Sequence, residues 1–311
     1  MQKQYDILVA GEINPDIILS GDVEPAFGQV EKLLDSAMLT VGSSSAIFAC
    51  GAARLGLKVG FIGRCGDDAF GSFMLEAMQK AGIDTRPVII VPGGSTGLSV
   101  ILAKGNDRAI LTYPGLIPTL TAEEITDDLL NRSRHLHVAS YFLQKALQPG
   151  LRHLFDRARG MGLTTSLDTN YDPSEEWQGV HELLSVTNVF LPNEVEICSL
   201  TASDHVEQAI QKLADRVETL AVKQGAGGAI AARDGEQVRV KALSVRVQDT
   251  VGAGDNFDAG FLYGYLHHWS LEESLRLAVV CGGLSTRVAG GTDGQPTLAE
   301  ARTWMKRIPE I

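Results

Sequence analysis

The sequence is poor in cysteine, in basic residues and in long apolar runs, and each shortage excludes a class of protein. Its 311 residues include 4 cysteines, which are widely spaced and form no CxxC pair, so we expect neither a zinc site nor a disulfide framework. Lys and Arg number 27 against 38 Asp and Glu, a net charge of −11, which disfavours nucleic acid as a partner. No apolar run is long enough to cross a membrane, and Asp6 and Glu12 interrupt the N-terminal apolar stretch. We therefore expect a cytoplasmic protein that does not bind membranes.

Several catalytic motifs are absent as well. There is no GxxxxGK[ST] sequence, so any phosphate transfer does not use a P-loop, and there is no HExxH metal motif. Residues 93–97 match GxSxG, but a strand rather than a helix is expected after them, which disfavours the nucleophile turn of a hydrolase.

What is present is an alternation of strand-length apolar runs with helical patterns. Such an order requires crossover connections, and it predicts one α/β domain over residues 1–311 with a doubly wound, mostly parallel sheet. The predicted strands are 6–10, 59–62, 136–139, 164–167, 189–191 and 220–222, and the clearest helices are 44–55 and 68–81.

Two segments, 17–40 and 88–112, break this alternation. Their short β-rich runs are joined by turns rather than helices, which predicts a small antiparallel sheet inserted into the domain. Because the insertions follow early strands of the main sheet, we interpret them as a lid beside the ligand-binding edge. The alternative is a peripheral hairpin that stiffens the sheet edge.

The most informative segment is DTVGAGDNFDAGFLYGYL, residues 249–266. Gly252, Ala253 and Gly254 are small residues at the expected start of a helix, where backbone N–H groups can converge on an anion. Asp255 follows directly, placed as a general base would be beside bound phosphate. The alternative is that Asp255 only caps the helix.

DTVGAGDNF resembles the second signature, D-T-x-G-A-G-D-x-F, of the ribokinase-like (PfkB) family of carbohydrate kinases. The resemblance extends over most of the chain in the right order. Residues 41–71 resemble the first signature of the family, GEINPD (11–16) its sugar-binding segment, LPNEVE (191–196) its N-x-x-E motif, and VKQGAGGA (222–229) its nucleotide loop.

On the substrate side, Asn14 and Asp16 can hold sugar hydroxyls, because a carboxylate accepts hydrogen bonds and an amide both donates and accepts them. Taken alone, Asn-Pro-Asp favours an ordinary turn over sugar binding. The resemblance adds Gly42 and Ser43 of the first signature to the substrate-binding residues.

On the nucleotide side, Asn193 and Glu196 can share a helix face and hold hydrated Mg²⁺, although the same spacing is a helix-capping pattern. Lys223, Gly225 and Gly228 would bind ATP if the resemblance holds, and would otherwise form an ordinary turn.

The resemblance implies transfer of the ATP γ-phosphoryl group to a hydroxyl, usually a primary one. Asp255 would accept the proton, the amides of residues 252–255 would stabilise the transferred group, and Mg²⁺ would bridge the phosphates. Similarity to ribokinase also implies a monovalent cation such as K⁺, held by backbone oxygens around Asp249 and Val251.

Three departures from the family pattern bear on the substrate. Ile47 and Ser140 stand where ribokinases place a substrate-binding Asn and Glu, and Asp172 stands where sugar kinases usually have Arg. Loss of that positive charge favours a neutral sugar or polyol. A nucleoside kinase, with Tyr113, Tyr141 or Phe142 as a wall for the base, and a catalytically silent sugar sensor are the alternatives.

The apolar residues of the predicted lid are expected to pack against another protein surface. Apolar residues such as Ile17, Leu19, Val100 and Ile110 would be exposed on its sheet, so we expect a homodimer through the lids.

Overall fold

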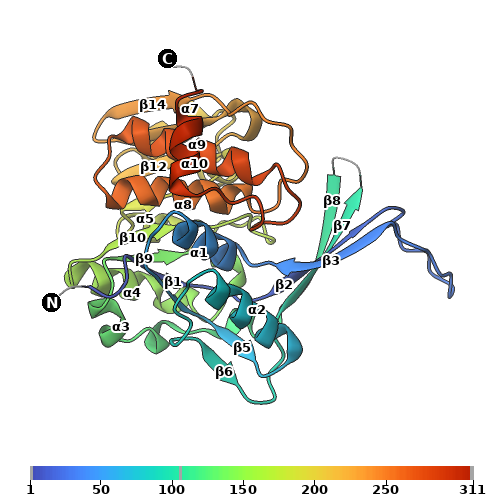
Figure 1. Cartoon of the computed structure of the whole chain (residues 1–311). Helices are drawn as coiled ribbons and strands as arrows, with labels where there is room; N and C mark the ends of the chain where they lie inside the picture. Colours follow the sequence, from blue (N-terminus) through green and yellow to red (C-terminus); the bar gives the residue numbers. More distant parts are fainter. Residues whose placement is uncertain (1–2, 105–106, 309–311) are drawn as a thin grey trace.

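The computed structural model describes residues 3–104 and 107–308, and a central eight-stranded sheet runs through it (Figure 1). Its strands are parallel except for the last two in the chain, which form an antiparallel edge. In spatial order they are β14 (Glu236–Val240), β13 (Ala229–Arg233), β12 (Thr219–Lys223), β11 (Val189–Phe190), β10 (Thr164–Leu167), β9 (His135–Val138), β1 (Ile7–Ala10) and β4 (Val59–Ile62).

Alternating side chains of each strand point to two separate cores. Ile7 and Val9 of β1 pack on one face of the sheet, and Leu8 and Ala10 pack on the other. The first face is covered by α1 (Ser44–Arg54), α2 (Ala69–Lys80), α8 (Ala253–Leu266), α9 (Leu271–Ser285) and α10 (Leu298–Met305). The second is covered by α3 (Asp127–Asn131), α4 (Gln148–Gly160), α5 (Val180–Leu184), α6 (Glu194–Thr201) and α7 (Val206–Leu213).

The predicted fold class, an α/β fold with a doubly wound and mostly parallel sheet, is confirmed. Helix α2 begins where its cap predicts, because the Asp68 carboxylate accepts from the Gly71 N–H at 2.8 Å. Short 3-10 turns connect several elements: η1 (Ile117–Thr119), η2 (Ala122–Glu124), η3 (Tyr141–Leu143) and η4 (Gly225–Gly227).

Chain direction across the sheet reverses at β1. From β1 the chain runs to β4 on one side, and from β9 it continues to β10, β11 and β12 on the other. Ligands of such sheets bind at the carboxyl ends of the strands beside this reversal, since the flanking connections diverge there. The topology therefore points to the loops that follow β1 and β9.

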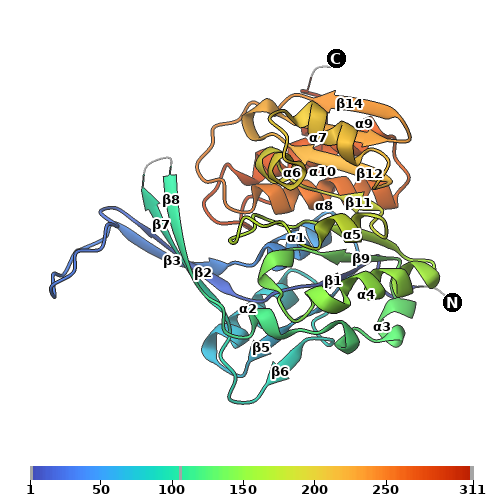
Figure 2. The ribbon, with the colours of Figure 1, turned by 180° about the vertical axis from the view of Figure 1, so that it is seen from behind.

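A second, four-stranded sheet projects from the body beside these loops (Figures 1 and 2). Its order is β3 (Ser36–Val41), β2 (Pro15–Ser20), β7 (Leu98–Lys104) and β8 (Asp107–Tyr113). The two outer pairings are antiparallel, whereas the central pairing joins strands β2 and β7 of separate insertions and is parallel.

The predicted insertion 88–112 divides between two sheets. Strand β6 (Ile89–Val91) pairs with β5 (Arg64–Gly66) in a two-stranded sheet apart from the projecting one. The apolar residues of β6 gave no sign of this partner, because pairing with β5 depends on a contact distant in the sequence.

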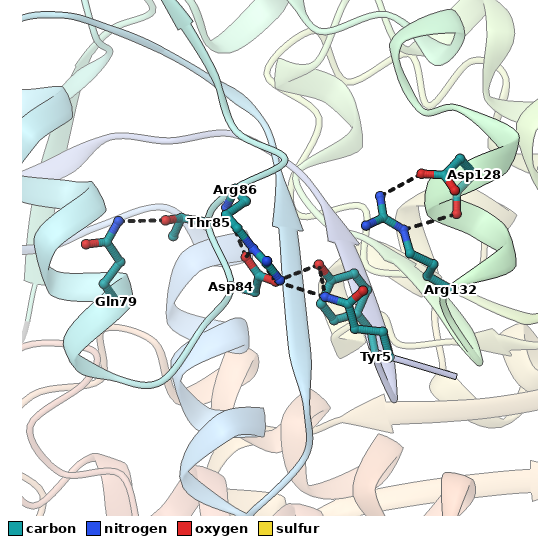
Figure 3. A network of polar contacts seen from close by, with 8 residues as sticks. Tyr5, Gln79, Asp84, Thr85, Arg86, Asp128 and Arg132 are labelled. Atoms are coloured by element: carbon teal, nitrogen blue, oxygen red, sulfur yellow. Dashed lines mark hydrogen bonds and ion pairs between the residues drawn. The ribbon is translucent and has the colours of Figure 1, made fainter. Parts of the chain in front are cut away.

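The amino-terminal edge of the molecule is held by a polar network (Figure 3). The Tyr5 hydroxyl donates to the Asp84 carboxylate at 2.7 Å, and the Arg86 guanidinium pairs with the same carboxylate. This network anchors the start of the chain to the loop after α2, at the ends of the strands opposite the projecting sheet. None of the helices within the described ranges is both long and apolar enough to cross a membrane.

Candidate active site

Polar side chains gather where the parallel strands end, facing the first turns of α1 and α8. Polar residues follow the strands on both sides of the chain reversal, and β9 and β10 also carry polar side chains of their own. The buried ones are Glu12, Asn14 and Asp16 after β1, Ser140 after β9 and Asp168 after β10, and the partly buried Asn193 follows β11.

Helix α8 begins without a side-chain cap. Its N-cap is Gly252, whose φ of 71° lies in the left-handed region. A Cβ there would stand 2.8 Å from both Gly291 Cα and Ile47 Cγ2, so glycine is required. The Ala253 N–H donates to the Thr250 carbonyl at 3.3 Å, and the next N–H groups, of Gly254 and Asp255, have no acceptor within the helix. The open first turn suits an anion.

Asp255 is the third residue of α8 and is 8% exposed. Burial raises the pKa of its carboxyl well above the usual range, repulsion by Asp168 and Glu12 adds to the shift, and Lys223 together with the Ser44 hydroxyl opposes it. Because Gly252 occupies the cap position, Asp255 is not the N-cap of α8. A buried carboxyl with a raised pKa beside an open helix start is suited to accepting a proton.

Lys223, at the end of β12, is held by acidic side chains. Its Nζ lies 2.8 Å from Asp168 Oδ2 and 3.2 Å from Asp258 Oδ2, so two carboxylates occupy its ammonium. Burial lowers the pKa of Lys223, but these carboxylates and Glu196 more than offset the effect and raise it.

The predicted substrate residues meet beneath the projecting sheet. The Asn14 amide donates to Asp16 Oδ1 at 3.2 Å and to Ser99 Oγ at 3.3 Å. A Cβ on Gly42 would lie 2.1 Å from Asp16 Oδ1, so Gly42 makes room for that carboxylate. Burial and repulsion by Glu12 raise the pKa of Asp16 to about 7, against the opposing charge of Arg108.

Ser43, the fourth predicted substrate residue, has a hydroxyl that is already engaged. It donates to the Glu12 carbonyl at 2.7 Å and accepts from the Ala46 N–H at 3.0 Å. Ser43 therefore caps α1, with its backbone in the left-handed region.

Glu12 is a buried residue for which the sequence predicted no role in the site. Its carboxylate accepts from the Ser45 hydroxyl at 2.5 Å and the Ser140 hydroxyl at 2.9 Å. From Ser140 the network continues to Asn170, whose amide also donates to Ser44 Oγ at 2.7 Å. An acidic residue directly after a buried strand was the available signal, because such a charge needs partners.

The motif Asn193 to Glu196 forms a complete capping box at the start of α6. The Glu196 carboxylate accepts from the Asn193 N–H at 2.8 Å, and Asn193 Oδ1 accepts from the Glu196 N–H at 2.9 Å. Burial and repulsion by Asp168 raise the pKa of Glu196 to about 7. The capping alternative is therefore realised in the fold, and metal binding remains a prediction.

A cavity of about 620 Å³ opens beside the first turn of α8. Glycines and apolar side chains dominate its lining, which suits a flat aromatic ring. The lining includes Lys223, Gly225, Gly228, Gly254, Phe257 and Gly283, so the predicted nucleotide-loop glycines lie at this cavity.

The carboxylate of Asp249 holds the loop that precedes α8 in its conformation. Asp249 Oδ1 accepts from the Val251 N–H at 3.0 Å, and Asp249 Oδ2 accepts from the Gly290 N–H at 2.9 Å. Above it, Arg108 of β8 donates to Thr250 Oγ1 at 3.3 Å, which connects the projecting sheet to this loop.

The residues that depart from the family pattern serve the fold. Ile47 is buried against Gly252, and the Asp172 carboxylate accepts from the N–H groups of Ser174 and Trp177. Tyr141 and Phe142 are packed into the second core, and Tyr113 lies on the exposed face of β8 opposite Thr112. None of these three aromatic residues therefore forms a wall beside Asp255.

The chain is similar to known proteins over most of its length. Residues 6–298 match the model of the pfkB family carbohydrate kinases. A 5-dehydro-2-deoxygluconokinase from Geobacillus kaustophilus is 30% identical over 329 aligned residues, covering 98% of this chain and 95% of the relative.

Solved structures establish the fold. Ribokinase from Arabidopsis thaliana, complexed with ribose and ATP, superposes with a TM-score of 0.85 at 24% identity, covering 98% of this chain and 99% of that one. Adenosine kinase from Sinorhizobium meliloti gives a TM-score of 0.84 at 24% identity, with the same coverage.

Proposed function

The chain belongs to the pfkB family of carbohydrate kinases and is an ATP-dependent kinase. On that premise, we propose that it transfers the γ-phosphoryl group of ATP to a primary hydroxyl of a neutral sugar or polyol. The observation that carries this proposal is the uncapped start of α8 beside the buried carboxyl of Asp255.

In the proposed reaction Asp255 accepts the proton of the attacking hydroxyl. The N–H groups of Gly254 and Asp255 stabilise negative charge on the transferred group, and the positive end of the α8 dipole adds to this. Asn14 and Asp16 hold the other hydroxyls of the sugar and so orient the attacking one. The projecting sheet serves as a lid that excludes water, a competing acceptor.

The residues present fit ATP and Mg²⁺. The cavity beside α8 accommodates the base and ribose, and its glycines let the nucleotide approach the backbone. Within the described ranges, no three acidic, His or Cys side chains surround a common metal position. Mg²⁺ would therefore arrive on the phosphates, with Asn193 and Glu196 contacting it through water, and when bound it neutralises phosphate charge.

K⁺ binding near Asp249 and Val251 is a further part of the proposal. The Asp249 carboxylate folds the loop that precedes α8, and a cation bound to that loop would strengthen the positive potential at the start of the helix. Comparing rates in KCl with rates in NaCl at equal ionic strength tests this: a higher rate in KCl is expected, and equal rates would contradict it.

Substrate charge is where the proposal and the named relative diverge. An acidic sugar of the kind named for the Geobacillus relative would carry a carboxylate, and such a group would meet the Asp16 and Glu12 carboxyls. Arg108 is the cation that faces Asp16 from the lid, and it favours an acidic sugar as the second candidate. A nucleoside has less support, since the three aromatic residues predicted for its base lie elsewhere.

A substrate panel assayed by ADP release tests these candidates. Neutral sugars, polyols, 5-dehydro-2-deoxygluconate and adenosine would each be given with saturating MgATP, with the Asp255→Asn variant as the background for ATP hydrolysis. Turnover on a neutral sugar supports the proposal, turnover on the acid alone supports the second candidate, and tight binding without turnover indicates a sensor.

We also propose a homodimer through the lids. Register pairs Ile17 with Leu39 and Val100, and Val100 with Leu111, so these four apolar residues share one face of the lid sheet. Asp16 lies on the opposite face, toward the site. Ile110, which the sequence also suggested for this surface, pairs with Ile101 and lies on that opposite face as well, because side chains alternate along the strand. Sedimentation should give a dimer that Val100→Lys converts to a monomer. A wild-type monomer at high concentration would contradict the proposal.

A further inference from the structure

A buried ion-pair cluster lies directly behind the first turn of α8. Lys223, whose side chain is 11% exposed, contacts Asp168 and Asp258, whose side chains are 3% and 1% exposed. The three residues come from the end of β12, the loop after β10 and the second turn of α8. The cluster therefore joins the helix that opens the site to two strands of the sheet.

The Lys223 ammonium also lies close to the open helix start. A Cβ placed on Gly254 would be 3.6 Å from both Nζ and Cδ of Lys223. Gly254 supplies one of the N–H groups assigned to the transferred phosphoryl group. Any displacement of Lys223 would therefore disturb the site of phosphoryl transfer.

Stability alone is a weak reason for such a cluster. Burying ions costs free energy that their mutual attraction only partly returns, and apolar residues of similar size often serve a core as well. Asp258 Oδ1 has no hydrogen-bond partner among the described residues, so the cluster is not fully satisfied as a structural element. Its place beside Asp255 suggests a role in the reaction.

We propose that Lys223, held between Asp168 and Asp258, is a positioning residue that fixes the first turn of α8 and supplies the positive potential under which Asp255 accepts its proton. The inference rests on the proposed kinase function. It assigns Lys223 to the proton acceptor rather than to the nucleotide.

The proposal can be tested through the direction in which each neighbouring charge shifts the pKa of Asp255. Lys223 lowers the pKa of Asp255, whereas Asp168 and Glu12 raise it. The charged and titratable groups that face Asp255 are Glu12 after β1, Asp168 after β10, Lys223 on β12 and Asp258 on α8, with Glu196 on α6 beside Lys223 and with Asp16 and Arg108 on the lid side.

The experiment measures kcat against pH at saturating MgATP and sugar for two single variants. Lys223→Met removes the positive charge, so the acid limb of the profile should move up by roughly one pH unit. Asp168→Asn removes a negative charge, so the limb should move down. Lys80→Met, which removes an exposed positive charge on α2, is the matched control and should leave the limb in place.

A merely structural cluster would give a different pattern. Loss of packing would lower kcat by the same factor at every pH, or would shift both limbs of the pH profile in the same direction. Either result would overturn the proposal. The double variant Lys223→Met with Asp168→Asn restores charge balance, and it should return the limb to near its wild-type position.

The double variant also decides the matter if Lys223→Met does not fold. The acid limb of the double variant is then compared with that of Asp168→Asn, because the two differ only in the charge of Lys223. An acid limb at higher pH in the double variant supports the proposal, and acid limbs at the same pH overturn it. A wild-type enzyme that phosphorylates no panel member would overturn the proposed function. Active enzyme with unmoved limbs would overturn this inference alone.

Discussion

Helices α6 and α8 both begin at the carboxyl edge of the sheet, but they treat their first N–H groups in opposite ways. At α6 the side chains of Asn193 and Glu196 satisfy them in a closed capping box. At α8 the cap is Gly252, which has no side chain to offer. A closed start stabilises its own helix, whereas an open start can stabilise a ligand. The buried carboxyl of Asp255, whose pKa is raised well above the usual range, lies beside the open one.

The largest expected effect comes from the carboxyl beside the open start. Asp255→Asn should lower kcat by about 10³-fold while ATP binding survives, because the proton acceptor is lost and the N–H groups remain. Steady-state kinetics and nucleotide titration would check this, and weakened ATP binding with unchanged kcat would contradict it.

The same variant should be more stable than the wild type at pH 8. The pKa of Asp255 is higher in the folded than in the unfolded chain. The folded protein therefore loses stability as the pH rises above the pKa that Asp255 has in the unfolded chain, until the buried carboxyl ionises as well. Asparagine removes that cost. Urea unfolding at pH 8 should show a higher free energy of unfolding for the variant.

Displacing the open start of α8 with a larger residue should have the next largest effect on kcat. Gly252→Ala forces a Cβ against Gly291 and Ile47 and strains the left-handed backbone, so the first turn must shift. We expect a loss of roughly 10² in kcat, since displacements of about 1 Å have that effect. Unchanged kcat would separate the helix start from catalysis. Gly56→Ala, also left-handed but with open space around it, is the matched control for backbone strain.

Sugar binding should depend on pH through Asp16. Its pKa is raised to about 7, and the ionised carboxylate accepts more and stronger hydrogen bonds from hydroxyls than the neutral acid does, so affinity should rise with pH. Between pH 6 and pH 8 the sugar Kd should fall about tenfold. Calorimetric titration would show this, and Asp16→Asn should bind more weakly at both values with little pH dependence.

Opening the closed start should have the smallest effect on catalysis. Asn193→Ala removes one side of the capping box and should lower the free energy of unfolding by about 1 kcal/mol. If Asn193 also contacts Mg²⁺ through water, the Mg²⁺ concentration that gives half-maximal rate should rise. A variant that loses stability alone would leave Asn193 a capping residue.

The sequence predicted the strands and helices well because strand-length runs and helical patterns alternate along the chain. The predicted strand 59–62 coincides with β4, a short apolar run, and the predicted strand 164–167 coincides with β10, which begins with two β-branched threonines. The functional meaning of Asp255 came from the DTVGAGDNF motif, and the structure places this residue beside the open helix start.

The contacts between distant residues were beyond the sequence. Lys223 meets Asp168 from 55 positions away and Asp258 from 35 positions away, and no local pattern encodes either pair. Glu12 likewise depends on Ser45 and Ser140, which reach it through the fold. Such partners decide whether a charged residue binds a ligand or another side chain.

The central claim is that the open start of α8 holds the transferred group while Asp255 accepts the proton. A crystal structure with MgADP, aluminium fluoride and the sugar selected by the panel tests it most directly. The account predicts the fluoride complex within hydrogen-bond distance of the Gly254 and Asp255 N–H groups, with the acceptor hydroxyl on the Asp255 carboxylate. A fluoride complex bound elsewhere, or a hydroxyl held by another base, would contradict it.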